Sequence, residues 1–237
     1  LLGSGGSILT VPTLVYLVGQ PERVAIAGSL AIVGCISAIT ALTYVRRKQI
    51  SWPNVLFFGM PSMVGSYAGA WLASFISGKL QLVLFAVVML LAAGFMLRPP
   101  RSHRQRSPRA VRRVALDGVL VGLLTGLIGV GGGFLIIPTL VLLGGLSMHI
   151  AVGTSLVIIA LNTATGFVKY LDVLQQHHLS LDWHIIWIFT GVGTIGSIIG
   201  SYLSSLTDGG VLRPVFGGAL VLLGAYILWN NLGHVPR

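Results

Sequence analysis

Two glycine-rich clusters, each followed by a proline, are the parts of this sequence best suited to binding chemistry. Glycine costs about 1 kcal/mol in the interior of a helix, and proline removes a backbone donor and clashes with the preceding turn. Each cluster therefore predicts a break in a helix. The first consists of Gly3, Gly5, Gly6 and Pro12, and the second of Gly129, Gly131, Gly132, Gly133 and Pro138.

A helix that restarts after such a break presents unpaired amide N–H groups, which carry the positive end of the helix dipole and attract anions. Within a membrane, freed peptide groups must find partners or line a polar cavity. The clusters thus predict a substrate site for a small anion. The alternative is that glycine only permits close helix packing, which is the favoured interpretation for the pairs Gly65/Gly69 and Gly196/Gly200.

Small polar side chains on the segment after each cluster could complete this site. Asn162 stands out because an amide in the middle of a bilayer is costly unless it has partners. Each hydroxyl taken singly is more typical of an ordinary bond between helices. The predicted contributors are Ser29, Thr154, Ser155 and Asn162, with Ser37 and Thr163 as further candidates.

The absence of several kinds of functional side chain from the predicted spans limits the possible functions of the protein. None of the predicted spans has an acidic or basic residue near its centre, whereas a cation carrier or proton relay usually needs a buried acid. We find no catalytic set of side chains, no convincing metal-ligand spacing and no nucleotide motif. We therefore expect no enzyme activity, no metal and no cofactor. Arg23 and His149 occupy equivalent loop positions, where they could draw anions to an outer mouth, although solvation at the surface is the simpler interpretation.

Composition makes the lipid bilayer the solvent of this chain. Of its 237 residues, 54% are hydrophobic and 8% are charged, whereas soluble domains carry roughly 25% charged residues. Runs of about 20 apolar residues can each cross a bilayer. The sequence predicts an all-α polytopic membrane protein of about eight transmembrane segments, at residues 1–18, 24–45, 54–75, 80–97, 114–146, 150–171, 183–206 and 211–232.

An internal repeat organises these segments. A shift of 126 residues places the first glycine cluster on the second and aligns Ser29 with Ser155. After a five-residue insertion, Trp52 matches Trp183. We therefore predict two homologous four-helix repeats, 1–97 and 114–237, joined by an Arg-rich linker at 98–113. The second repeat has a longer apolar stretch before its glycines, so we expect the first helix to be truncated.

The positive charges predict an orientation, because Lys and Arg concentrate in cytoplasmic loops. Repeats of four spans share one orientation, which places twelve of the fifteen Lys and Arg residues on the side of the linker. Segment 114–146 is too long for one straight span, however. If it enters and leaves on one side in both copies, the repeats are inverted and the count becomes eleven against four. We favour a broken span. Either count makes the linker cytoplasmic.

The paired Gly-x-Gly-Gly motifs with their prolines, and the Ala-x-x-x-Ser-Leu run at 25–30 and 151–156, resemble the TauE/SafE sulfite exporter family. The resemblance covers essentially the whole chain except the Arg-rich linker. It implies a multi-pass protein of the inner (plasma) membrane that moves sulfite or related sulfur-containing anions, usually outward. Ser7 departs from this pattern, because it stands where the second copy has Gly133.

Together these observations predict a secondary transporter that exports sulfite or a related organosulfonate anion by alternating access between the repeats. A facilitative anion pore and a non-transporting membrane scaffold remain as alternatives. The expected partners are a small anionic substrate and the lipid bilayer, with homo-oligomerisation left open. Nucleic acid is not expected as a partner, because the basic residues lie in short loops between apolar runs.

Overall fold

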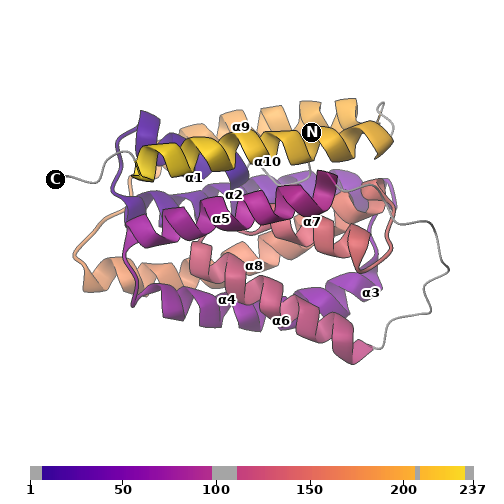
Figure 1. The fold of residues 1–237 in the computed structure, drawn as a ribbon, viewed down its shortest axis with the longest axis horizontal. Coiled ribbons are helices and arrows are strands. Elements are labelled where there is room, and N and C mark those ends of the chain that lie inside the picture. The colour runs from indigo at the N-terminus through magenta and orange to yellow at the C-terminus, as the bar shows by residue number, and fades with distance from the viewer. Residues whose placement is uncertain (1–6, 98–110, 206–208, 233–237) are drawn as a thin grey trace.

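The computed structural model describes residues 7–97, 111–205 and 209–232, and these residues form a bundle of helices without strands (Figure 1). Their order along the chain is α1 (Ser7–Pro12), a π-helical turn (Thr13–Leu17), α2 (Glu22–Arg46), α3 (Trp52–Asn54), a second π-helical turn (Val55–Gly59), α4 (Met60–Ala73), α5 (Gly78–Leu97), α6 (Val111–Ile128), α7 (Gly133–Leu142), α8 (Met148–Gln176), α9 (Trp183–Ser205) and α10 (Gly209–Leu232).

The helix boundaries lie close to those predicted from apolar runs and turn residues. Helix α2 begins after Pro21, the continuous segment of α3 and α4 begins at Trp52, and α5 begins at Gly78. Four described helical segments are long and apolar enough to cross a membrane: Glu22–Arg46, Trp52–Ala73, Met148–Gln176 and Trp183–Leu203. The all-helical membrane class is therefore confirmed.

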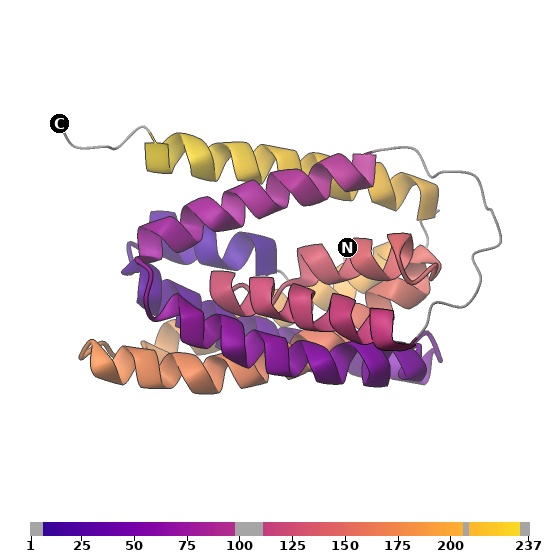
Figure 2. The same ribbon diagram turned by 60° about the horizontal axis from the view of Figure 1, so that its bottom comes forward.

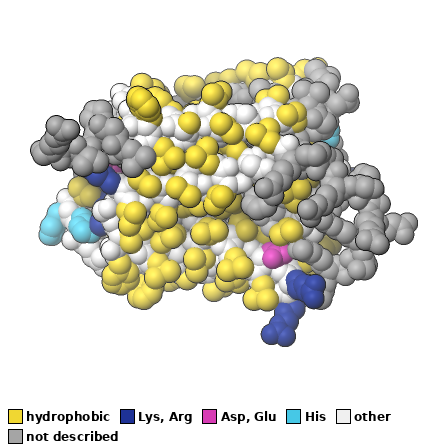
Figure 3. Space-filling view, in the orientation of Figure 1, with side chains coloured by type: hydrophobic (Ala, Val, Ile, Leu, Met, Phe, Trp, Pro, Cys, Tyr) yellow, Lys and Arg dark blue, Asp and Glu magenta, His cyan; other side chains and the backbone are white. Residues whose placement is uncertain are grey.

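The outer surface of the bundle is suited to lipid. In Figure 3, hydrophobic side chains cover the middle of the visible face, and the coloured Lys, Arg and His side chains lie near the two ends of the long axis. Helix α9 illustrates this surface, because Val192, Ile195 and Ile199 are all exposed. An apolar belt between charged ends is the pattern expected of a chain that spans a bilayer.

Helices α2 and α8, which the sequence repeat equates, pack against each other in opposite directions. Gly153, near the start of α8, lies against Tyr44 near the end of α2, whereas Thr163 contacts Gly34 further back along α2. Equivalent helices that run antiparallel belong to inverted repeats. The expectation that both copies share one orientation is therefore wrong.

Helices α6 and α7 form a hairpin that explains this inversion. Helix α6 runs inward from one end of the bundle, the chain turns at residues 129–132, and α7 returns to the same end (Figure 2). Val121 of α6 packs in one cluster with Ile136 and Leu140 of α7. The favoured prediction of a single broken span is thus also wrong, because the chain enters and leaves on one side.

The hairpin is fixed by very close packing of α6 against α4. A Cβ atom added to Gly118, Gly122 or Gly126 of α6 would overlap the backbone of Phe58, Ser62 or Ser66. Gly65 and Gly69 of α4 lie equally close to the backbone of α6. The packing role expected for Gly65 and Gly69 is confirmed, whereas Gly196 has open space around its Cα atom.

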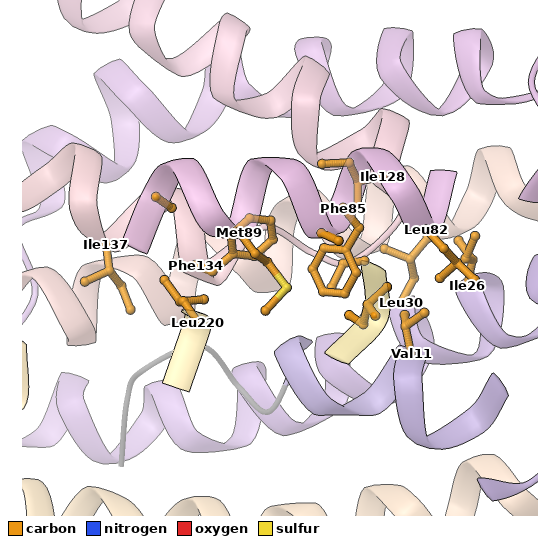
Figure 4. Packing of buried hydrophobic residues seen from close by; sticks show 14 of the residues in the cluster. Val11, Ile26, Leu30, Leu82, Phe85, Met89, Ile128, Phe134, Ile137 and Leu220 are labelled. Atoms are coloured by element: carbon orange, nitrogen blue, oxygen red, sulfur yellow. The ribbon is translucent and has the colours of Figure 1, made fainter. Parts of the chain in front are cut away.

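The hydrophobic core lies between the hairpin and the helices around it. Figure 4 shows side chains of α1, α2, α5, α6, α7 and α10 meeting in one cluster. Within it, the rings of Phe85 and Phe134 meet edge to face, with centroids 5.4 Å apart. Phe134 lies in the first turn of α7, so the core holds the start of that helix in place.

Candidate functional site

The predicted interruption at the second glycine cluster is confirmed. Helix α6 ends at Ile128 and α7 begins at Gly133. Between them, Gly129, Gly131 and Gly132 have φ values of +74°, +70° and +74°. Side chains rarely adopt this left-handed region, so glycine is required for the turn itself.

The first amide groups of α7 have no recorded partner within the described part of the chain. Among the described residues, no backbone carbonyl outside the helices and no capping side chain accepts a hydrogen bond from the N–H of Gly133 or Phe134. Both residues are buried. The positive end of a ten-residue helix therefore lies inside the protein without a cap, which is the arrangement that favours a bound anion.

Neighbouring helices close tightly around the glycines. A Cβ atom on Gly131 would lie 2.6 Å from Cγ2 of Thr163, and one on Gly132 would overlap Thr125. A Cβ atom on Gly129 would overlap Ile26. The glycines therefore permit close approach as well as positive φ. The turn is packed shut in this conformation.

Ser37 and Thr163 are equivalent in the sequence repeat and differ in their bonding. Thr163 donates to the Ile159 carbonyl at 2.7 Å and lies beside Gly131. Ser37 is fully buried, but its hydroxyl has no hydrogen-bond partner. It follows Val33 by one helical turn, and Val33 also borders Gly131. A buried hydroxyl with free bonding capacity therefore lies one helical turn along α2 from Val33.

Asn162 occupies the interface between α8 and α4. Its Nδ2 donates to Oγ of Ser62 at 2.6 Å, whereas its Oδ1 is buried without a partner. Rotating the amide by half a turn would let Oδ1 accept from Ser62 and free the NH₂ group. Asn162 therefore keeps half of its bonding capacity in reserve in either orientation.

The three predicted hydroxyl residues have different positions. Ser29 reaches the turn, because its hydroxyl lies 2.8 Å from the Ile26 carbonyl and 3.2 Å from the Gly129 carbonyl. Ser155 donates to the carbonyl of Val152 within its own helix. Thr154 accepts from the N–H of Ser51 at 2.9 Å and so holds the loop after α2. Ser29 therefore has a hydrogen bond to the turn.

The prolines lie away from the interruption itself. Pro138 is buried in the middle of α7, and Pro12 is the last residue of α1, where a π-helical turn follows. Helix α1 contacts α7, so segments that follow the two clusters are neighbours. Gly3, Gly5 and Gly6 lie outside the described residues.

Gln81 and Tyr170 form a polar pair beside the turn that the sequence did not predict. Gln81 of α5 donates from Nε2 to the hydroxyl of Tyr170 at 2.7 Å and to the Leu127 carbonyl at 3.0 Å. The Tyr170 hydroxyl lies 2.9 Å from the position that a Cβ atom on Gly129 would occupy. The available signal was the pairing of Tyr44 with Tyr170 in the repeat, which does not reveal the contact with Gln81.

Comparison with known proteins supports the resemblance. The family model described as "Sulfite exporter TauE/SafE" matches residues 1–227. A "Probable membrane transporter protein" of Xylella fastidiosa is 28% identical over 98% of this chain and 90% of its own length. The "Probable membrane transporter protein YunE" of Bacillus subtilis is 25% identical over 98% of this chain and 93% of its own length. No solved structure gives a significant match.

Proposed function

Since the chain belongs to the sulfite exporter TauE/SafE family of membrane transporters, we propose that it is a secondary transporter of sulfite or related sulfur-containing anions. The observation that carries the proposal is the uncapped start of α7, buried where the chain turns back within the bundle. A small oxyanion supplies the acceptors that these amide groups lack.

The substrate site in this proposal is built from α7, α2 and α8. The N–H groups of Gly133 and Phe134 bind the anion, and the hydroxyl of Ser37 and the amide of Asn162 complete its shell. Neutral donors suit a carrier because they bind an anion without holding it as strongly as a fixed cation would. The closed packing around Gly131 and Gly132 corresponds to an occluded state.

Alternating access follows from inverted repeats in this scheme, because one half can rock against the other around a shared site. The count of positive charges predicts the orientation of the protein in the membrane. With inverted repeats, eleven of the fifteen Lys and Arg residues belong to the end that carries the linker, including Arg46, Arg47 and Lys48. The linker end then faces the cytoplasm of the inner (plasma) membrane.

Flux of radiolabelled sulfite in proteoliposomes that contain the full-length protein tests the proposal. We expect saturable flux that unlabelled sulfite, sulfonates or thiosulfate reduce by competition. Accumulation against a concentration gradient, driven by an imposed ion gradient, would distinguish a carrier from a pore. Inserted protein that gives no more flux than empty liposomes with any of these anions would contradict the proposed function.

Asn162→Ala provides the test of the site. We expect it to lower sulfite flux at least tenfold, because one of the few donors to the anion is lost. Thr154→Ala is the matched control on the same helix, since Thr154 holds a loop, and its flux should stay near that of the wild type. Equal flux in Asn162→Ala and wild type would remove Asn162 from the site.

A further inference from the structure

A half-buried arginine lies at the end of the bundle opposite the linker. Arg23 is in the first turn of α2, and its Nη2 donates to the carbonyl of Ile76 at 3.3 Å. Its Nη1 is buried and has no hydrogen-bond partner. Arg23 is therefore only partly exposed, and one of its guanidinium nitrogens is shielded from solvent.

The nearest acidic side chain does not neutralise Arg23. Glu22 precedes it, but the Glu22 side chain packs over Gly78, where a Cβ atom would lie 3.6 Å from its carboxylate oxygen. Among the described residues, the ion pair recorded joins Lys169 to Asp172. A buried guanidinium nitrogen without a partner is costly, so this arrangement calls for an acceptor that the described residues do not supply.

Arg23 lies near Tyr170, which adjoins the glycine turn. It lies close enough to Tyr170 to interact with that side chain electrostatically. The Tyr170 hydroxyl is bonded to Gln81 and adjoins Gly129, the first residue of the turn. Arg23 and the pair of Gln81 and Tyr170 therefore lie near one another beside the turn.

We propose that Arg23 forms a second anion site, distinct from the start of α7, which receives an oxyanion at the end of the bundle opposite the linker. When the groups that cover Nη1 move aside, the guanidinium binds one oxygen of the anion through this nitrogen, with a geometry suited to sulfite, sulfonate or phosphate groups. Since the proposed function places the substrate at the turn, this inference rests on it and adds a site between the turn and one membrane face.

Two sources could supply such an oxyanion: the transported solute or the phosphate of a lipid headgroup. The proximity of Arg23 to Tyr170, whose hydroxyl adjoins the turn, favours the solute. We therefore expect Arg23 to set the KM for anion on its own side of the membrane. The KM at the linker end should be unaffected, because the site there is reached from the other direction.

The test measures the KM for sulfite transport by the full-length protein in vesicles of both orientations. It compares Arg23→Gln and Arg23→Lys with wild type. We expect Arg23→Gln to raise KM about tenfold on the Arg23 side alone, with the maximal rate changed by less than about twofold. Arg23→Lys should be intermediate, since charge is kept but the planar fork is lost. Lys79→Gln is the control, because Lys79 is exposed at the start of the neighbouring helix α5.

The same comparison separates the possible failures. Absent flux in wild type would contradict the proposed function. If the wild type transports sulfite and Arg23→Gln has the same KM as wild type on both sides of the membrane, the Arg23 site is overturned and the proposed function is not. If Arg23 instead binds a lipid headgroup, KM should be the same in Arg23→Gln and wild type. Added phospholipid should then raise the thermal stability of wild type in detergent but not that of Arg23→Gln. That result would also overturn the proposed solute site at Arg23.

Discussion

The methyl group of Thr163 lies directly against Gly131, 2.6 Å from where a Cβ atom would be. A residue of one repeat-equivalent helix thus fills the space that the glycine turn leaves free. The contact links the shape of the turn to the position of α8. Any side chain at residue 131 has to displace α8 or the turn.

Gly131→Ala should therefore be more destabilising than a change of backbone preference alone. The left-handed φ costs about 1 kcal/mol or more, and overlap with Thr163 adds about 1–3 kcal/mol. Unfolding in mixed micelles by a denaturing detergent measures the difference. Gly145→Ala is the matched control, because Gly145 has φ +68° and open space. Equal losses in the two variants would show that packing contributes nothing.

Gly122→Ala should weaken the pairing of α6 with α4, because the new Cβ would overlap the Ser62 carbonyl. We expect a loss of about 1–3 kcal/mol in the free energy of unfolding. The same change at Gly196, which has open space, should be nearly neutral or slightly stabilising. If Gly122→Ala also proved neutral, the close approach of the two helices would be refuted.

Asn162 and Ser62 should be energetically coupled through their 2.6 Å hydrogen bond. A double-mutant cycle with Asn162→Ala and Ser62→Ala measures this coupling in the free energy of unfolding. Hydrogen bonds between membrane helices average about 0.6 kcal/mol and reach about 1.7 kcal/mol, and the buried position favours the upper part of this range. Strict additivity of the two changes would mean that the bond does not contribute.

Gln81→Leu should destabilise the protein by about 1–3 kcal/mol, because two acceptors lose their donor. These are the Leu127 carbonyl and the Tyr170 hydroxyl. Adding Tyr170→Phe should cost less in the Gln81→Leu background than in wild type, since the hydroxyl is then already unpaired. Thermal unfolding of the four proteins in one detergent measures this, and equal costs in both backgrounds would contradict the contact.

The inverted arrangement of α2 and α8 can be tested by labelling single cysteines from one side of the membrane. In a Cys35→Ala background, Arg47→Cys and His177→Cys place cysteines at exposed sites after the ends of α2 and α8. We expect a membrane-impermeant maleimide to reach these two sites from opposite sides. Labelling of both cysteines from the same side would contradict the inverted arrangement and support parallel repeats.

Local features of this fold could be predicted from the sequence because they depend on residues close together in the chain. Apolar runs and turn residues located the helices, and Gly129, Gly131 and Gly132 located the interruption. The direction of α7 could not be predicted, because a broken span and a hairpin need the same glycines. It is determined by tertiary contacts, such as the packing of Val121 against Ile136 and Leu140.

The site was predictable to a smaller extent. Asn162 could be predicted because an amide is rare within a bilayer. In the structure, its Oδ1 is buried without a partner. In the sequence, Thr154 and Thr163 are equally good candidates. In the structure, Thr154 lies about 13 Å from Thr163 along the helix and accepts a hydrogen bond from a loop. The pair of Gln81 and Tyr170 joins residues 89 positions apart, and a single sequence gives no sign of such a contact.

The hairpin of α6 and α7 is tethered at one membrane face only. Its tip, at residues 129–132, can therefore tilt or withdraw without pulling a connecting strand of chain across the bilayer. Gly144 and Gly145 lie in the turn that leads from α7 to α8, where Gly145 has a φ of +68°. Once its packing against α4 loosens, a hairpin attached in this way can change which membrane face its tip points to while the long helices α2 and α8 stay in place.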